Sequence, residues 1–365
     1  MLERFKVKPE DRVMIDHESL QATVAALFEK MGVPKDQAAE GADVLTMTDL
    51  RAVETHGVSN MMRAYIQMYS GGRMNPNPNV RTVRETPGTA VMDADGGLGI
   101  MVGRGAMNIA IEKARNVGTG VVTMSNSGHL GAVGHFAMIA AQNDMIGVCM
   151  TAGGASVLPT FGAEGRLGAN PISYAAPARN QPPVLFDVAT SAVAMNKVGL
   201  ARRVGSDLLP GWVADLDGNP IMTEVAPEEA GNFFGLPFGG TREGGSHKGY
   251  GFSMMVEIFG GLLSDSVPSM LDDTPFQSGF KHYFAAYNVS AFTDLDVFKD
   301  KMDRILDMLQ NTKPAPGQDR VLYPGLPEAE EEKDRRANGI PLHSEVVEWF
   351  DDVCGEFTVS PLKRV

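Results

Sequence analysis

One short stretch of the sequence places groups together that could handle a carboxylate and a proton. Only seven histidines occur in the chain, and His56 follows Thr55, stands shortly after Arg51 and is followed by Gly57. An imidazole can accept or donate a proton near neutral pH, and a guanidinium can hold a carboxylate with two parallel hydrogen bonds. The stretch therefore predicts acid–base chemistry on a carboxylate. The alternative is that His56 only caps a helix.

A second group of polar and glycine residues, 125–134, directly follows a strand-like run at 121–124. It contains Ser127, His129 and Gly131. A strand that leads through glycines into a helix can turn backbone N–H groups toward an anion. The group could hold a phosphate, a carboxylate or an amide, or it could be a plain turn in which Ser127 caps the next helix.

Two further segments carry candidate binding groups. Asp187 ends an apolar run and is followed by Thr190 and Ser191. Its carboxylate could orient an imidazole, while the alternative is a helix cap. His247 and Lys248 lie among glycines ahead of an expected helix, an arrangement that suits phosphate but is weak as a lone motif.

Several familiar sites are missing from the sequence, which contains no HExxH, CxxC, GxxxxGK[ST] or GxSxG. His129 and His135 have a poor spacing for a helical pair of metal ligands. A metal-dependent hydrolase that uses His56, His129 and Asp187 is kept as an alternative. The glycines of 97–103 imitate a dinucleotide fingerprint, but the strand at 121–124 ends without the acidic residue that a Rossmann unit needs. We therefore expect a loop and a helix start at 97–103.

The composition limits the possible partners. The net charge of −13 argues against broad binding to nucleic acid or to an anionic membrane, because phosphate groups would be repelled. Cys149 and Cys354 are too few for a disulfide scaffold and suit a reducing compartment. No apolar run reaches about 18 residues and no signal peptide is recognisable. We expect a cytoplasmic protein with a small-molecule partner.

Hydrophobic spacing indicates helices at both ends of the chain and a sheet between them. From about residue 80, short apolar runs alternate with glycines and helical segments. The acidic run 328–332 is interpreted as a solvated surface segment. We expect helices at 19–31, 35–48, 60–69, 107–115, 136–142 and from about 291, a buried helix at 256–263, and strands at 121–124, 146–150 and 184–186.

Taken in order, these segments resemble the malate/L-lactate dehydrogenase family. This family lacks a Rossmann fold and includes ureidoglycolate, sulfolactate and diketogulonate oxidoreductases and piperideine-2-carboxylate reductase. Any one segment is weak evidence, but the ordered set is specific and covers nearly the whole chain. The matching segments are 49–58, 125–134, 167–172, 186–191, 215–220, 237–240, 248–252 and 323–325.

The resemblance implies a mixed α+β fold. A central, largely antiparallel sheet domain, 81–289, would bind NAD or NADP. A helical domain would combine 1–80 with 290–365. The protein would be a homodimer. It implies that His56 is the proton donor or acceptor, that Asp187 and Thr55 form a relay with it, and that Arg51 holds the substrate carboxylate. No metal ion is expected. The cofactor-binding positions would be Ser127, His129, Gly131, Asp187, Thr190, Ser191, His247, Lys248 and Gly325.

The expected activity is hydride transfer between NAD or NADP and a small 2-hydroxy or 2-oxo carboxylate, like malate or lactate. Thr55 replaces the family's usual serine, which keeps the hydroxyl and adds a methyl group, and Ala52 replaces its usual glycine near the substrate, so each functional group is kept. One alternative is a reductase of cyclic or N-methyl imino acids that uses the same site. Another is the metal-dependent hydrolase, and a third is a carboxylate-binding protein without catalysis.

Overall fold

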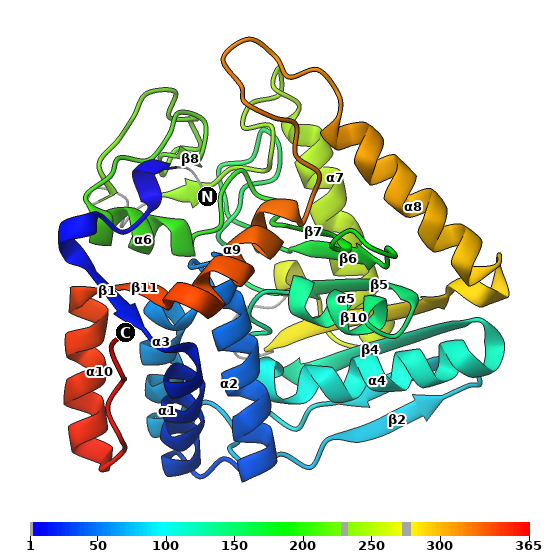
Figure 1. Cartoon of the computed structure of the whole chain (residues 1–365), viewed down its shortest axis with the longest axis horizontal. Coiled ribbons are helices and arrows are strands. Elements are labelled where there is room, and N and C mark those ends of the chain that lie inside the picture. The colour runs from blue at the N-terminus through cyan, green and yellow to red at the C-terminus, as the bar shows by residue number, and fades with distance from the viewer. Residues whose placement is uncertain (1–2, 228–232, 272–278) are drawn as a thin grey trace.

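A seven-stranded sheet forms the centre of the computed structural model, which describes residues 3–227, 233–271 and 279–365 (Figure 1). Only β3 and β4 pair in parallel; the other neighbouring strands of this sheet are antiparallel. The expected largely antiparallel fold is thereby confirmed, and a Rossmann fold is excluded. The strands, in spatial order, are β2 (Arg81–Glu85), β3 (Thr89–Asp93), β4 (Thr119–Ser127), β10 (Phe280–Asn288), β5 (Met145–Ala152), β6 (Ile172–Ala176) and β7 (Val184–Val188).

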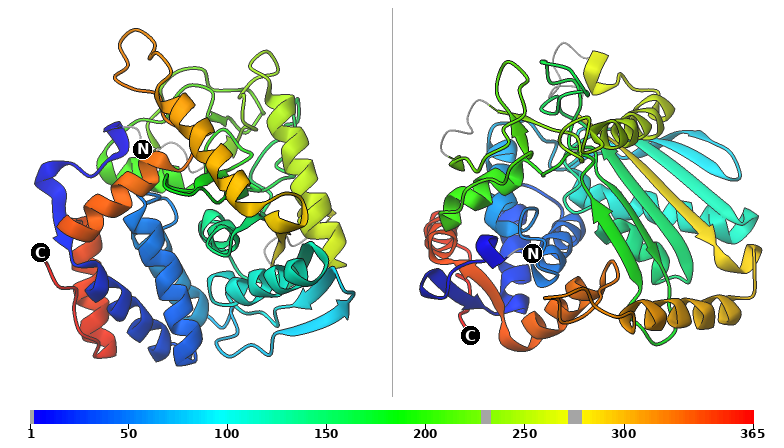
Figure 2. Two further views of the ribbon diagram at one scale, coloured as in Figure 1. Left: turned by 45° about the vertical axis from the view of Figure 1, so that its right-hand side comes forward. Right: turned by 90° about the horizontal axis from the view of Figure 1, so that it is seen from above.

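Helices cover both faces of this sheet (Figure 2). On one face lie α4 (Gly99–Val117) and α5 (Gly134–Ala141), and on the other lies α7 (Ser246–Val256), continued by the π-turn η4 (Glu257–Gly261) and the 3₁₀ turn η5 (Leu262–Ser264). Glycines in the strands permit close approach of the helices. A Cβ at Gly120 of β4 would lie 1.9 Å from the carbonyl oxygen of Ala110 in α4.

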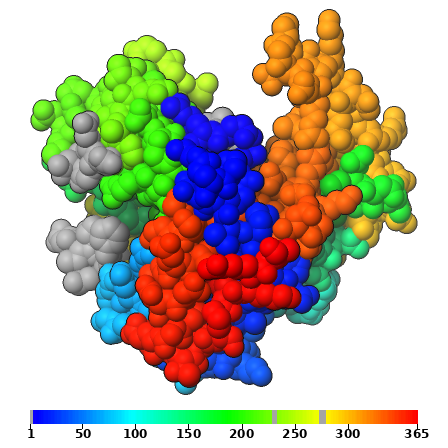
Figure 3. All heavy atoms as spheres, turned by 60° about the vertical axis from the view of Figure 1, so that its left-hand side comes forward, coloured from blue at the N-terminus to red at the C-terminus, as the bar shows by residue number. Residues whose placement is uncertain are grey.

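The two ends of the chain form a separate helical layer beside the sheet. A two-stranded sheet joins them, and the Val365 N–H donates to the carbonyl oxygen of Met14. Figure 3 shows the N-terminal and C-terminal segments, blue and red, gathered on one side of the molecule. The elements of this layer are β1 (Arg12–Ile15), α1 (His17–Lys30), α2 (Lys35–Leu50), α3 (Val58–Ser70), α9 (Leu326–Asn338), β11 (Ile340–His343) and α10 (Ser344–Phe357).

Two segments cross the expected border between a helical and a sheet part. The first contains α6 (Asn196–Val204), β8 (Val213–Ala214) and β9 (Phe234–Gly235), and its small core includes Phe5 from the N-terminus. The second is α8 (Leu295–Gln310), whose Asp303 accepts hydrogen bonds from the backbone after β6. The division into 1–80 with 290–365 and 81–289 stays a prediction.

The helices and strands expected from the sequence are confirmed, with shifted ends. The interpretation of 256–263 as a buried helix is wrong, because Ile258, Phe259 and Leu262 expose much of their surface. The acidic run 328–332 is not simply a solvated segment either. It lies in α9, where Glu328 and Glu332 are half-buried and line a cavity. Among the described residues, no helix is both long and apolar enough to span a membrane.

Candidate active site

Two loops that are distant in sequence lie against each other. One, 51–57, joins α2 to α3, and the other, 128–133, joins β4 to α5. The rings of His56 and His129 stack, with centroids 5.6 Å apart and planes inclined by 14°. The structure thus brings the predicted proton-transfer histidine next to a predicted cofactor-binding residue.

Buried charges anchor the first loop. Arg335 of α9 is 4% exposed; its Nη1 donates to the carbonyl oxygen of Asp49 over 2.7 Å and its Nη2 to Glu54 Oε1 over 2.9 Å. Asp49 Oδ2 accepts the N–H of Val58, at the start of α3, over 2.8 Å. Because a buried charge without its partner is costly, these contacts hold the loop that carries Arg51 and His56 in place.

The surroundings of His56 favour a neutral imidazole. Its Nδ1 lies 2.9 Å from Thr55 Oγ1. Burial, together with the charge of Lys197, lowers the pKa of His56 to about 4. Lys197 lies on α6 with its Nζ 5.2 Å from the centre of the Phe5 ring. The sequence motifs did not point to Lys197, because its neighbours in space come from distant segments.

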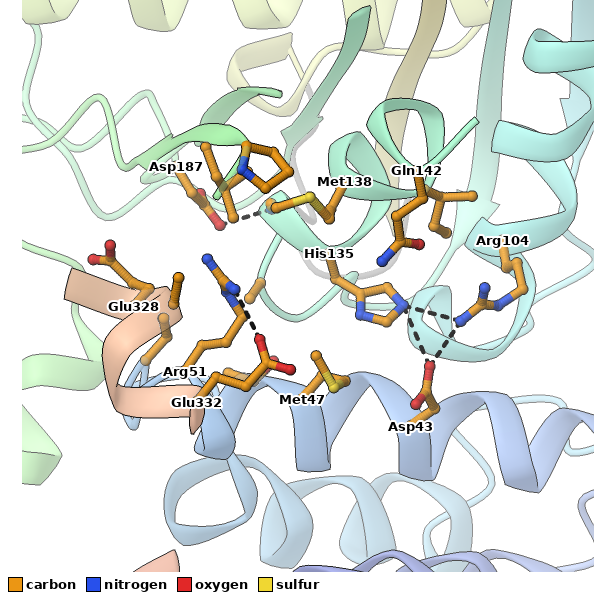
Figure 4. A pocket seen from close by; sticks show the side chains of 18 of the residues that line it. Asp43, Met47, Arg51, Arg104, His135, Met138, Gln142, Asp187, Glu328 and Glu332 are labelled. Carbon is orange, nitrogen blue, oxygen red and sulfur yellow. Dashed lines mark hydrogen bonds and ion pairs between the residues drawn. The ribbon is translucent and has the colours of Figure 1, made fainter. Parts of the chain in front are cut away.

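A cavity of about 520 Å³ opens beside the two loops, between α2, α5, α9 and the end of β7 (Figure 4). Arg51 points into the cavity and its Nη1 pairs with Glu332 Oε2 over 2.9 Å. The volume is in the range of small-molecule sites. The guanidinium suits an anionic ligand that competes with Glu332.

A second group of charges lines the same cavity. Arg104 Nη2 lies 2.7 Å from Asp43 Oδ2 and 3.2 Å from His135 Nε2, and Arg104 also pairs with Glu40. Burial lowers the pKa of His135 to about 3, and the charges of Arg104 and Arg51 act in the same direction. The sequence interpretation considered His135 only as a poor metal ligand, since its partners come from α2 and α4.

Asp187 lies across the cavity from Arg51 (Figure 4). Its Oδ2 accepts a hydrogen bond from the N–H of Gly134 over 2.7 Å. Burial raises the pKa of the Asp187 carboxyl to about 6. Neither a hydrogen bond nor an ion pair joins Asp187 to His56 among the described residues. The partner that the structure gives to His56 is Thr55, and the predicted relay through Asp187 has no contact to support it.

Three predicted cofactor-binding hydroxyls are engaged within the protein. Ser127 Oγ donates to the carbonyl oxygen of Gly128 over 3.3 Å, Thr190 Oγ1 to that of Ala169 over 3.0 Å, and Ser191 Oγ to that of Val193 over 2.8 Å. Each hydroxyl oxygen still has lone pairs with which it can accept a bond.

The other predicted cofactor positions lie around the same edge of the sheet. Gly325 has a φ of +96° and packs against β7, where a Cβ would lie 2.7 Å from the Leu185 nitrogen. Gly131 has a φ of +71° in the second loop. His247 and Lys248 are exposed at the start of α7, close to Thr190, because a Cβ at Gly249 would lie 2.8 Å from the Thr190 carbonyl oxygen.

No cluster of three or more His, Cys, Asp or Glu side chains that could hold a metal ion is found in the part of the chain that the structure describes.

Comparisons with known proteins give one consistent answer. A family model described as malate/L-lactate dehydrogenase matches residues 15–351. The malate dehydrogenase of Pyrococcus horikoshii is 36% identical over 356 residues, 97% of this chain and 98% of that protein. The L-sulfolactate dehydrogenase of Methanocaldococcus jannaschii is 34% identical over 347 residues, 94% of this chain and 97% of that protein. The crystal structure of malate dehydrogenase from Entamoeba histolytica superimposes with a TM-score of 0.90 at 32% identity, covering 96% of this chain and 99% of that chain.

A substitution at Gly57 tests the position of the first loop, because a Cβ at Gly57 would lie 1.9 Å from Asp49 Oδ1. Gly57→Ala should lower the free energy of unfolding by about 1–3 kcal/mol, as overpacking does. Gly105→Ala is the matched control, since nothing lies within 4 Å of its Cβ in α4, and it should keep or raise stability. Denaturant unfolding measures both variants. Equal stability of Gly57→Ala and the wild type would show that Asp49 is placed elsewhere.

Proposed function

The chain belongs to the malate/L-lactate dehydrogenase family, and we propose that it carries out 2-hydroxy acid oxidation at the cavity that is lined by parts of the two loops carrying His56 and His129. As a member of that family it is a 2-hydroxy acid dehydrogenase. The observation that supports the location is that Arg51 enters the cavity from the same loop that carries His56. None of the findings supports the metal-dependent hydrolase.

For the substrate we propose a malate-like 2-hydroxy carboxylate. Arg51 pairs with Glu332, so a bound substrate would exchange the Glu332 carboxylate for its own carboxylate at the same guanidinium. Holding the carboxylate there would orient the reacting carbon, which can supply several kcal/mol toward the barrier. The relatives named malate and L-sulfolactate dehydrogenase, each at least 34% identical, support an acid with a second anionic group.

A nicotinamide dinucleotide, NAD or NADP, would supply the acceptor for the hydride. The described residues fit such a group, because polar and apolar side chains share the cavity, where Met47 and Met138 line it beside Arg51 and Asp187. Exposed Lys248, at the start of α7, suits a phosphate. The residues that we propose hold the cofactor are Ser127, His129, Gly131, Asp187, Thr190, Ser191, His247, Lys248 and Gly325.

In the proposed reaction His56 accepts the hydroxyl proton during oxidation and donates it back during reduction. With its Nδ1–H donated to Thr55 Oγ1, the Nε2 of His56 is left free to act as the base. We therefore assign to Thr55 the orienting role that the resemblance implied for Asp187 and Thr55 together. Asp187 faces the same cavity and holds the second loop through Gly134.

Replacement of His56 tests this role. His56→Ala should lower the rate of oxidation on the order of 10²–10⁴-fold, because acid–base catalysis is lost. Absorbance of the reduced cofactor is followed with malate, lactate, ureidoglycolate and sulfolactate in the presence of NAD or NADP, and with their oxo forms in the presence of NADH or NADPH. His17→Ala, in the first turn of α1, is the control and should keep full activity.

Two results would contradict the proposal. Unchanged turnover in His56→Ala would refute the role of His56. Reduction of piperideine-2-carboxylate, without reaction of any hydroxy acid, would favour the imino acid reductase instead.

The lowered pKa of His56 predicts an unusual pH profile. Since the base form exists above a pKa of about 4, kcat/KM for oxidation should stay level as the pH falls from 8 to about 5. Lys197→Met removes a cation that lowers this pKa, so the acid limb should move to higher pH. A wild-type limb near the ordinary histidine value of about 6.5 would contradict the assignment.

We further propose that the protein is a homodimer that uses the outer face of α7, η4, η5 and the segment after them, up to the 3₁₀ turn η6 (Ser269–Leu271). Large apolar side chains are exposed there over consecutive turns, and Leu262 is 54% and Leu271 71% exposed. Contiguous apolar surface of this kind marks an interface, and twofold homodimers are the commonest assemblies. The exposed side chains of this face are Phe252, Ile258, Phe259, Leu262, Leu263, Val267 and Leu271.

The double variant Phe259→Glu and Leu262→Glu should dissociate the dimer, because it places two carboxylates in the proposed apolar interface. The mass in solution is measured by light scattering after gel filtration. Leu216→Glu is the control, since Leu216 is similarly exposed, at 57%, but lies away from this face. A dimer that persists in the double variant would place the interface elsewhere.

Two further proposals concern the location of the protein and its division into domains. Cys149 and Cys354 are both free and buried, which supports a reducing, cytoplasmic location. The resemblance supports a helical domain of 1–80 with 290–365 and a cofactor domain of 81–289.

A further inference from the structure

Tyr65 is a fully buried phenol of α3 whose hydroxyl reaches the second loop. Its side chain is 0% exposed, and its Oη lies 2.7 Å from His129 Nδ1. Burial raises the pKa of the Tyr65 phenol far above the usual value, so the hydroxyl keeps its proton. A buried hydroxyl needs a hydrogen-bond partner, and in the described chain this partner is His129.

A second donor points at the same nitrogen of His129. The backbone N–H of Gly131 donates to Nδ1 over 3.3 Å. A protonated Nδ1 would set two N–H groups against each other, whereas an unprotonated Nδ1 can accept from both Gly131 and Tyr65. In the neutral imidazole the single proton then lies on Nε2.

The Nε2 of His129 has no partner in the protein, as far as the described residues extend. The ring itself is held, because it stacks on His56 and meets the edge of Phe280, with centroids 5.4 Å apart at 69°. Its pKa is lowered to about 3, mainly by burial, so the ring stays neutral. A fixed, neutral ring that stacks on His56 therefore has one N–H group with which it can donate a hydrogen bond to a ligand.

We propose that Tyr65 is a positioning residue that fixes His129 in the tautomer with its proton on Nε2, so that His129 donates a hydrogen bond to an oxygen atom of the bound ligand. The carboxylate or carbonyl of a 2-oxo acid and the amide of a nicotinamide all present such an oxygen. The two histidines then have different roles: His129 donates a hydrogen bond, while the neighbouring His56 transfers the proton. The link to catalysis rests on the proposed dehydrogenase function, whereas the tautomer does not.

Nitrogen NMR of the protein labelled with ¹⁵N-histidine reads the tautomer directly. Seven histidines give a simple spectrum, and His129→Gln assigns the signals by their loss. In the wild type we expect an unprotonated Nδ1 and a protonated Nε2 for His129, and in Tyr65→Phe a mixture of both tautomers. A proton on Nδ1 in the wild type, or a Tyr65→Phe spectrum identical to it, would overturn the proposal.

Tyr69→Phe is the matched control. Tyr69 lies one turn later on α3, is also buried, and donates its hydroxyl to Met101 Sδ over 3.3 Å instead of to a histidine. Both variants lose one buried hydroxyl, so a merely structural role would affect them alike.

The activity readout separates the two variants. Tyr65→Phe should lower kcat/KM roughly five- to tenfold, the effect of one lost hydrogen bond, while Tyr69→Phe keeps it. An equal loss of kcat/KM in both variants would count against a positioning role. If the wild type oxidises no hydroxy acid, the proposed function fails, while the wild-type tautomer still decides whether Tyr65 positions His129.

Discussion

One buried guanidinium determines where the chemistry can take place. Arg335 comes from the C-terminal helix α9, yet its partners are the Asp49 carbonyl, just before the loop that carries Arg51 and His56, and the Glu54 carboxylate, within that loop. An uncompensated charge at this depth would cost several kcal/mol, so the helix and the loop are stable only together. The same helix presents Glu332 to Arg51, which makes the C-terminal segment part of the wall of the site.

The second loop depends on the sheet in the same way. His129 follows the end of β4, and Asp187 lies at the end of β7. The Asp187 carboxylate accepts a hydrogen bond from the Gly134 N–H at the start of α5. Since β10 lies between β4 and β5, its first residue, Phe280, reaches the ring of His129. The mostly antiparallel order of strands thus gathers side chains from three distant segments at one edge, without the crevice of a Rossmann sheet.

The stacked imidazoles of His56 and His129 are both neutral. Burial disfavours the charged form of His56 and of His129, and two adjacent imidazoles cannot both be protonated at low cost. Each ring therefore needs a partner that selects its tautomer. Thr55 stands next to His56, and Tyr65 stands next to His129. The two rings are chemically alike, and their hydrogen-bond partners suit them to different tasks.

Local pattern was enough to predict the main helices and strands, and the ordered motifs around His56, His129 and Asp187 were enough to predict the family, because these signals lie within short stretches of chain. The sequence also pointed to Arg51, which the structure places in the lining of the cavity. Only the tertiary structure decided that Thr55, and not Asp187, contacts His56, that Tyr65 contacts His129 while Lys197 lies near His56, and that the apolar turns after α7 face outward. The contact of Tyr65 with His129 and the proximity of Lys197 to His56 join residues far apart in the chain, and neither periodicity nor residue type records such distances. The contact of Thr55 with His56 depends on side-chain geometry, which the sequence does not record either.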